Sequence, residues 1–230
     1  MKPLRLFVTG TDTGVGKTRV ATALCRAFAR LGARVGAMKP IASGCELTPA
    51  GLRNEDALAL LAAMTVRAAY EQVNPYAFSA PIAPHIAARD AGTAIDFAVL
   101  DRAYERLCLQ SDVLIVEGAG GWLVPIDAGR SFADIAQHWQ LGVVLVIGMR
   151  LGCLNHALLT ARAIAGSGLT LCGWVANCVE ESFPRCEENL AYLHDALQAP
   201  CLGVLPHAPH ASADTVADGI QPGILLDSTM

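Results

Sequence analysis

The chain has 230 residues, which is enough for one domain with a full hydrophobic core. Its 53% hydrophobic and 17% charged residues exclude a disordered or fibrous protein. A formal net charge of −4, with no cluster of Lys or Arg, excludes nucleic acid as a bulk electrostatic partner. We therefore expect a single globular domain over residues 1–230.

The eight cysteines are scattered, with no C-x-x-C pair and no spacing typical of a metal site. Most lie in apolar stretches, so we expect reduced core thiols in a cytoplasmic protein. Lys2 and Arg5 precede an apolar run that is too short for a signal peptide. The longest uncharged stretch, 163–179, is interrupted by glycines and is not typical of a membrane span. We expect no membrane partner.

The first half of the chain alternates apolar strands with amphipathic helices. We expect a strand at 4–8, a Gly-rich turn at 10–18, a helix that ends at Gly32 and a strand at 34–38. Residues 41–53 have a loop-like composition, and a helix is expected at 54–63. Three prolines indicate irregular structure at 74–84, followed by helices near 83–90 and 96–109.

The second half continues the alternation. Strands are expected at 113–116, 143–147, 171–176 and 201–205, with helices at 154–166 and 185–197. Ser131 and Asp134 form a capping-box pattern at the start of another helix, and the chain from about residue 208 is loop-like. Solid apolar strands separated by helices predict an α/β fold, with a mostly parallel sheet and helices on both faces.

The most informative motif follows the first strand: Gly10-Thr11-Asp12-Thr13-Gly14-Val15-Gly16-Lys17-Thr18. A strand, a Gly-rich turn, Gly-Lys-Thr and a helix make up a phosphate-binding P-loop. Lys17 would supply a positive charge to the outer phosphates, and the Thr18 hydroxyl would ligate magnesium. The usual spacing places the first glycine at position 11, where this chain has threonine. The loop is one residue longer than usual.

Polar residues follow several of the predicted strands. The P-loop follows the first strand, Lys39 and Ser43 follow the strand at 34–38, and Glu117 follows the strand at 113–116. Asn177 follows the strand at 171–176, and the loop 206–209 follows the last strand. Ligands of parallel α/β sheets bind at the carboxyl ends of the strands. These residues therefore predict a single site at that edge.

Two carboxylates are candidates for a magnesium site. Glu117 ends an apolar strand in a Walker B arrangement, although a carboxylate there could also cap the next turn. Asp56 is less distinct, because Glu55 is adjacent and either could be a solvated acid in the first helical turn.

Lys39 distinguishes between functional hypotheses. It could be a surface charge, but Pro40, Ser43 and Gly44 follow it closely and could gather donors around an anion. Lys17 and Lys39 would then flank the γ-phosphate, which suits transfer of phosphate to an anionic acceptor. Asn177 is interpreted as a contact to the adenine edge, although it lacks the lysine of the guanine-binding Asn-Lys-x-Asp motif.

Taken together, these segments resemble the dethiobiotin synthetase family over nearly the whole chain. The resemblance rests on the P-loop and on Lys-Pro-x-Ala-Ser-Gly at 39–44, Gly-Leu-Arg-Asn-x-Asp at 51–56, Val-Asn-Pro-Tyr at 73–76, Pro-His at 84–85, Val-Glu-Gly-Ala-Gly-Gly-Trp at 116–122, Leu-Gly-Cys at 151–153 with Asn-His at 155–156, and Gly-Trp-Val-Ala-Asn at 173–177. The longer P-loop is also the spacing of this family.

The resemblance implies an ATP- and Mg²⁺-dependent cyclo-ligase. This enzyme converts 7,8-diaminononanoate and CO₂ to dethiobiotin through a carbamate and its mixed anhydride with phosphate. It implies catalytic roles for Lys39 and Lys17 and a magnesium set of Thr18, Asp56 and Glu117. It implies these nucleotide contacts: Thr13, Gly14, Val15, Gly16, Lys17, Thr18, Asp56, Glu117, Gly118, Ala119, Gly120, Asn177, Cys178, Pro206, His207 and Ala208. It implies substrate contacts at Thr13, Ser43, Gly152, Cys153 and Asn155, and a homodimer.

The chain departs from the family at three places: Gly14 replaces a common glutamate, 180–192 matches poorly, and His207 stands at a position that is aromatic in some relatives. The alternative hypotheses are an ATPase switch of the partitioning or septum-site type and a P-loop small-molecule kinase. The switch proteins carry a lysine early in the loop, where this chain has Thr11, Asp12 and Thr13.

Overall fold

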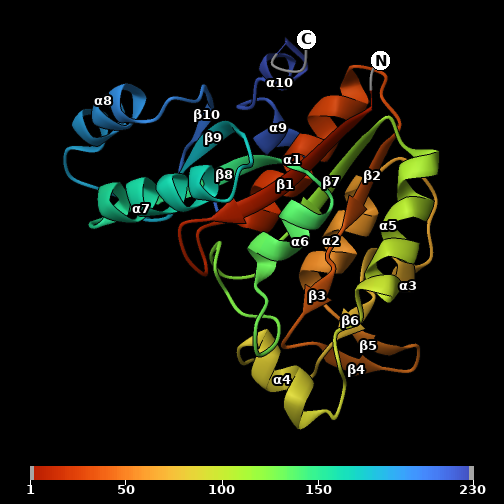
Figure 1. The fold of residues 1–230 in the computed structure, drawn as a ribbon. Coiled ribbons are helices and arrows are strands. Elements are labelled where there is room, and N and C mark those ends of the chain that lie inside the picture. The colour runs from red at the N-terminus through yellow and green to blue at the C-terminus, as the bar shows by residue number, and fades with distance from the viewer. Residues whose placement is uncertain (1–2, 228–230) are drawn as a thin grey trace.

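The computed structural model describes residues 3–227 and contains one parallel sheet of six strands (Figure 1). In spatial order these are β10 (Cys201–Leu205), β9 (Leu171–Cys178), β8 (Gly142–Met149), β1 (Leu4–Gly10), β7 (Val113–Glu117) and β2 (Val35–Met38). All neighbouring pairs are parallel. The P-loop strand β1 therefore lies centrally, and the carboxyl ends of all six strands meet at one edge.

Helices cover both faces of the sheet because the central strands alternate between two apolar cores. Leu6 and Val8 of β1 pack into one core, and Phe7 packs into the opposite one. The first face carries α1 (Lys17–Arg30), α2 (Glu55–Ala63), α3 (Tyr70–Val73), α9 (Ala213–Ala217) and α10 (Gly223–Asp227). The second face carries α5 (Phe97–Gln110), α6 (Phe132–His138), α7 (Cys153–Gly166) and α8 (Cys186–Ala196).

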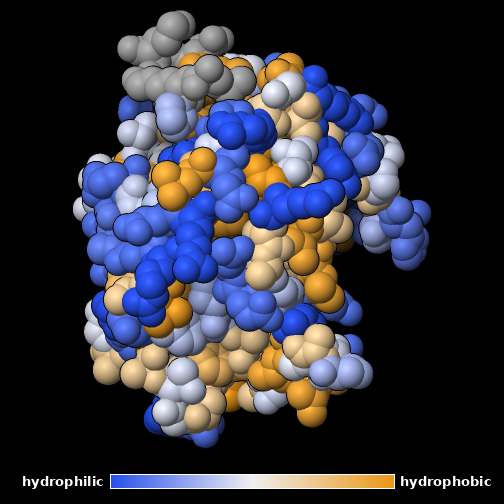
Figure 2. Space-filling model, turned by 90° about the vertical axis from the view of Figure 1, so that its right-hand side faces the viewer, coloured by the Kyte–Doolittle hydropathy of each residue, from blue (hydrophilic) through white to orange (hydrophobic). Residues whose placement is uncertain are grey.

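A small group of short elements extends beyond the carboxyl ends of β2 and β7, at the lower end of Figure 1. It contains β3 (Ile41–Ala42), which pairs with β6 (Tyr76–Ala77), the hairpin of β4 (Glu46–Thr48) and β5 (Gly51–Arg53), and α4 (Pro84–Asp90). Figure 2 shows that hydrophobic side chains are more frequent toward this lower end than elsewhere on the face in view. These elements form a wall beside the site described below.

The predicted fold class is confirmed, and so is the capping box of α6, where the Ser131 N–H donates to Asp134 Oδ2 at 2.7 Å. Two expectations of irregular structure are wrong in part, because 41–53 contains β3, β4 and β5 and 74–84 contains β6. These strands are two or three residues long, too short to show a period of alternation.

The expectation of a loop-like tail from residue 208 is also wrong. Helices α9 and α10 form there, and Val216, Ile220 and Leu225 are buried in the same core as α1. Pro209, Pro222 and Gly223 interrupt the sequence and obscured this apolar pattern. Among the residues that the structure describes, no helix is long and apolar enough to cross a membrane.

Candidate active site

The P-loop joins β1 to α1 and is held open by glycines. Gly14 and Gly16 have φ angles of 73° and 91°, a left-handed backbone conformation that residues other than glycine rarely adopt. At position 16 a β-carbon would also lie 2.2 Å from Nδ2 of Asn177. The absence of a side chain here lets Asn177 donate to the carbonyl of Val15 at 2.9 Å, which ties the loop to the end of β9.

Lys17 is the first residue of α1, and its side chain folds back over the loop. Its Nζ donates to the carbonyl of Asp12 at 2.9 Å. Burial and the nearby ammonium of Lys39 lower the pKa of Lys17 from 10.5 to about 8. An anionic ligand beside Lys17 would favour its charged form and raise this pKa again.

Thr18 lies between the two candidate metal-binding carboxylates. Its Oγ1 is 2.7 Å from Oδ1 of Asp56 and 2.8 Å from Oε1 of Glu117. A hydroxyl has one proton and can donate to only one of them at a time. Three hard oxygen atoms thus meet from α1, from α2 and from the end of β7. The other carboxylate oxygen of Glu117 is buried and has no hydrogen-bond partner among the described residues.

Lys39 follows β2 and is 3% exposed. Its Nζ donates to Oε1 of Glu117 at 2.6 Å, to Oδ2 of Asp56 at 3.0 Å and to the carbonyl of Gly118 at 3.0 Å. Although burial opposes its charge, the two carboxylates raise the pKa of Lys39 above 10.5. Burial raises the pKa of Glu117 despite the opposing effect of Lys39. For Asp56, burial is outweighed by Lys39 and Thr18, and its pKa is lowered.

A buried hydrogen-bond chain fixes Lys39 relative to α2. Asn74 Nδ2 donates to the carbonyl of Lys39 at 2.7 Å, and Asn74 Oδ1 accepts from the Tyr70 hydroxyl at 2.9 Å. The same hydroxyl accepts from the backbone N–H of Asn54 at 2.7 Å. Asn54 caps α2 by accepting from the N–H of Ala57. The chain of bonds therefore links the backbone of Lys39 to the start of α2, the helix that carries Asp56.

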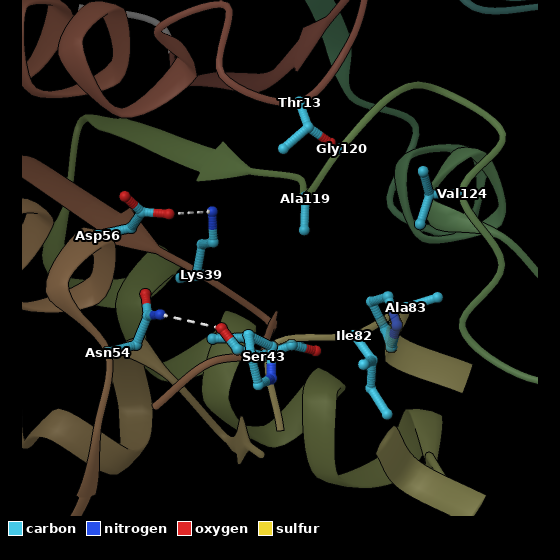
Figure 3. A pocket seen from close by; sticks show the side chains of 13 residues that line it. Thr13, Lys39, Ser43, Asn54, Asp56, Ile82, Ala83, Ala119, Gly120 and Val124 are labelled. Carbon is cyan, nitrogen blue, oxygen red and sulfur yellow. Dashed lines mark hydrogen bonds and ion pairs between the residues drawn. The ribbon is translucent and has the colours of Figure 1, made fainter. Parts of the chain in front are cut away.

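A cavity of about 490 Å³ opens beside Lys39. Figure 3 shows Lys39 pointing into it between Asp56 and Ala119, with Thr13 and Gly120 on the P-loop side and Ser43 and Ile82 on the opposite side. The hydroxyl oxygen of Ser43 is buried and has no partner within the described chain. The rest of the lining is largely apolar: Ala42, Pro81, Ala83, Pro84 and Val124. The cavity suits a small molecule with an aliphatic part and a reactive group next to Lys39.

A second group of predicted residues lies at the ends of β9 and β10. A cavity of about 470 Å³ is lined there by Cys178, Pro206 and His207, together with residues 180–184 and Cys186. Ala208 follows in the same loop. Asn177 is buried, with its amide held by Val15 and by Arg19, whose guanidinium donates to Asn177 Oδ1 at 2.7 Å. The expected contact of Asn177 to adenine remains a prediction.

The remaining substrate residues are not part of either cavity. Gly152, Cys153 and Asn155 lie at the start of α7, after β8. Cys153 is buried in the core between α7 and β9, and its N–H donates to the carbonyl of Arg150. Asn155 is exposed. Within one chain, the structure brings Thr13 and Ser43 together but not these three residues.

Comparison with known proteins agrees with this geometry. A family model described as an AAA domain matches residues 4–215. The ATP-dependent dethiobiotin synthetase BioD of Pseudomonas aeruginosa is 55% identical over 212 residues, which cover 92% of this chain and 93% of that protein. The enzyme of the same name from Xanthomonas oryzae pv. oryzae is 49% identical and covers 96% of this chain and 99% of its own length. The chain belongs to the dethiobiotin synthetase family. The predicted family is confirmed.

Solved structures support the P-loop fold. The septum-site-determining protein MinD of Pyrococcus horikoshii, solved with Mg-ADP, has a TM-score of 0.53, 17% identity, and coverage of 98% of this chain and 89% of its own. The receptor FtsY of Elizabethkingia anophelis has a TM-score of 0.51 and 16% identity, with 99% and 65% covered. At these identities the likeness is one of fold alone.

Sequence reasoning missed several residues that organise the site. The sequence does not single out Tyr70, and Asn54 and Asn74 occur there only within family segments and, for Asn54, at the start of an expected helix. Their function depends on contacts between residues 16 to 35 positions apart, which no local pattern encodes. The sequence also gives no signal for the contacts of Arg19 in α1, which bonds to Asn177 at the end of β9 and to Pro206 just after β10.

Proposed function

We propose that this chain is an ATP-dependent dethiobiotin synthetase that closes the ureido ring of dethiobiotin from 7,8-diaminononanoate and CO₂ in biotin biosynthesis. Membership of the family supports the reaction, and one observation supports it at the site. Lys39 projects into a largely apolar cavity immediately beside the P-loop. An acceptor in that cavity would lie next to both the phosphates and a fixed cation.

The reaction requires an anion to attack an anion. One amine of the substrate adds to CO₂ and loses a proton to give a carbamate. A carbamate oxygen then attacks the γ-phosphorus of ATP, and ADP leaves. The second amine attacks the carbonyl carbon of the mixed anhydride, and phosphate leaves as the ring closes. Lys17 and Lys39 would reduce the repulsion between the carbamate and the γ-phosphate, because each contributes a positive charge beside the reacting atoms.

The residues present fit a magnesium ion. Thr18, Asp56 and Glu117 offer hard oxygen atoms, and one carboxylate oxygen each of Asp56 and Glu117 lies within 2.8 Å of Thr18 Oγ1. No group of three or more His, Cys, Asp or Glu side chains within residues 3–227 is arranged to hold a metal. A site with two carboxylates and one hydroxyl suits Mg²⁺, which keeps several waters and binds substrate phosphates. When bound, the ion would neutralise phosphate charge during transfer.

The substrate and nucleotide contacts follow from the same assignment. Thr13 and Ser43 would contact the diamine in the cavity, and the loops after β9 and β10 would hold the base. Gly152, Cys153 and Asn155 lie outside the cavity of their own chain, so they would contact the carboxylate tail of the substrate only in a homodimer that places them beside the cavity of a second copy. All eight cysteines are free thiols, which supports a cytoplasmic location.

The test is to measure ADP and phosphate formation with each substrate omitted in turn. We expect turnover only when diaminononanoate and bicarbonate are both supplied with ATP and Mg²⁺. ATP turnover that is independent of the diamine would contradict the proposal. It would favour the ATPase-switch hypothesis, for which the present support is a fold shared at 17% identity.

A further inference from the structure

Two cysteines lie beside the cavity at the ends of β9 and β10. Cys178 is the last residue of β9, and Cys186 is the first residue of α8. Both line the cavity of about 470 Å³, and both pack on the core that α7, α8 and β9 share. Each thiol is free and each residue is only partly buried, so small solutes in the cavity can reach both. The reaction steps of the proposed function use neither thiol.

The two thiols are direct neighbours. The residues are eight positions apart, and the chain returns to the end of β9 through Arg185, whose φ of 60° is rare outside glycine. Burial, together with the adjacent thiol of Cys186 and the hydrogen bond between the two side chains, raises the pKa of Cys178. A disulfide requires its two side chains to face each other at short range, and this pair meets that requirement.

A third thiol lies in the same core but is placed differently. Cys153 at the start of α7 is 3% exposed and does not line the cavity. Burial raises its pKa, and the nearby thiol of Cys186 contributes to the shift. Cys186 is therefore close to two thiols, of which only Cys178 shares the cavity with it. An oxidant that enters the cavity meets Cys178 and Cys186 together.

Hydrogen peroxide can convert such a pair to a disulfide. The raised pKa of Cys178 keeps its thiol protonated, so attack begins with the Cys186 thiolate. Its sulfur bonds to one oxygen of the peroxide, the O–O bond breaks, and hydroxide leaves. Cys178 then gives up its proton and attacks the sulfur of Cys186, which breaks the S–O bond as the disulfide forms. Two thiols and one peroxide thus give one disulfide and two waters, and the thiols lose two electrons.

The disulfide would change the shape of the cavity. It closes residues 179–185 into a ring, and residues 180–184 of this segment line the cavity. A disulfide joins its sulfur atoms at about 2.05 Å, much closer than two thiols in contact, so it draws the start of α8 toward the end of β9. Phe183, which offers a flat surface to a base, belongs to the closed segment and must move with it.

We propose that Cys178 and Cys186 form a modification site for hydrogen peroxide, and that the disulfide lowers the affinity of the enzyme for ATP by narrowing the cavity after β9 and β10. The effect on ATP rests on the proposed function, which places the base in this cavity. The formation of the disulfide is independent of that function.

The first measurement identifies the bond. Reduced wild-type protein is treated with a small excess of hydrogen peroxide, free thiols are alkylated, and unreduced peptides are mapped by mass spectrometry. We expect the peptides of Cys178 and Cys186 to be joined within one chain. Pairing of Cys186 with Cys153, pairing between chains, or oxidation of single cysteines alone overturns the proposal.

The second measurement is the affinity for a fluorescent ATP analogue before peroxide, after peroxide, and after reduction with dithiothreitol. We expect oxidation to weaken binding by about tenfold, the loss typical of one stacked base, and reduction to restore it. Cys186→Ser should remove the difference between the oxidised and reduced forms. Cys172→Ser is the matched control, because Cys172 lies on the same strand but outside the cavity, and it should keep the difference.

A change of less than threefold in the wild type, or an equal change in Cys186→Ser, overturns the effect on ATP. If Cys186→Ser does not fold by circular dichroism, Cys186→Ala replaces it with the same expectation. Should turnover be independent of the diamine, the proposed function fails, while the peptide map and the oxidised-to-reduced ratio still decide the role of the two cysteines.

Discussion

The ammonium group of Lys39 lies 2.6 Å from Oε1 of Glu117, and the two side chains are 3% and 0% exposed. Such a pair is costly to bury, and it is stabilising only while both partners and their hydrogen bonds are present. Lys39 also bonds to Asp56 and Gly118, so three oxygen atoms surround its nitrogen. The charge that would assist phosphate transfer is therefore built into the fold.

The first prediction concerns the loss of Lys39. Lys39→Met leaves Glu117 as a buried carboxylate without its cation, and we expect a loss of about 3–5 kcal/mol in the free energy of unfolding. Turnover should be abolished, while ATP binding should remain measurable because the P-loop is unchanged. Urea unfolding and a nucleotide-binding titration measure the two effects separately.

The matched control removes both charges. In Lys39→Met/Glu117→Gln no buried charge of the pair remains, so at least half of the lost stability should return. If the two substitutions lower the stability additively, the charges of Lys39 and Glu117 are not coupled. Full activity of Lys39→Met would contradict the role of Lys39 toward the acceptor.

A second prediction follows from the lowered pKa of Lys17. Burial and Lys39 bring this pKa to about 8 in the free protein, and phosphate oxygens should raise it in the complex. Between these two values, ATP binding must take up a proton. The affinity should then fall about tenfold for each pH unit above 8, because the free enzyme is increasingly neutral at this position.

Calorimetry in two buffers of different ionisation enthalpy measures the proton uptake directly. We expect nearly one proton per ATP at pH 9 and much less at pH 7. Lys17→Gln has no titrating group and serves as the control, with weaker binding and no such uptake. Equal uptake in the variant would assign the proton to another group.

The fold and the chemistry of the site could be predicted from the sequence more completely than the contacts that hold the site residues in position. The P-loop, Lys39 and Glu117 could be located because each follows an apolar strand, and parallel strands end at one edge. Lys39 and Glu117 could both be placed at this edge, but the 2.6 Å contact between them across 78 residues could not be predicted. Asp56 could not be separated from Glu55, since only the rotation of α2 decides which one approaches Thr18.

Other features were hidden because their determinants are distant in sequence. The packing of α9 on α1 depends on apolar side chains separated by prolines and glycine, so local composition indicated a loop. The bond of Arg19 to Pro206 joins residues 187 positions apart. Such contacts are set by the topology of the sheet, and they become visible only when the strand order is known.

A third prediction tests the hydrogen-bond chain behind Lys39. Tyr70→Phe keeps the ring that packs under Arg53 but removes the hydroxyl that joins Asn54 to Asn74. Two buried groups lose their partner, so we expect a loss of about 1–3 kcal/mol in stability. We also expect a fall of roughly tenfold in kcat, because a small displacement of a catalytic group is costly.

The Tyr70 variant should still bind ATP measurably, since the hydrogen bonds within the P-loop do not depend on this chain of bonds. Tyr76→Phe is the control, because its hydroxyl bonds to the backbone of Asp96 at an exposed position. Unchanged kcat in Tyr70→Phe, with stability lowered as expected, would show that the chain of bonds supports the fold without positioning Lys39.

The last prediction tests how the C-terminal helices are attached to the sheet. Gly203 of β10 lies against the turn after α9, and a β-carbon at this position would be 2.0 Å from the carbonyl oxygen of Gly219. Gly203→Ala must push this turn outward, which exposes Val216 and Ile220 of the core shared with α1. We expect a loss of roughly 1–3 kcal/mol in the free energy of unfolding.

Gly166→Ala is the matched control, because it lies at the end of α7 with no atom near the added carbon, and it should be neutral or stabilising by about 0.5–1 kcal/mol. Urea unfolding of the two variants compares them directly, and equal stability of Gly203→Ala and the wild type would mean that the turn after α9 does not pack on β10 in solution.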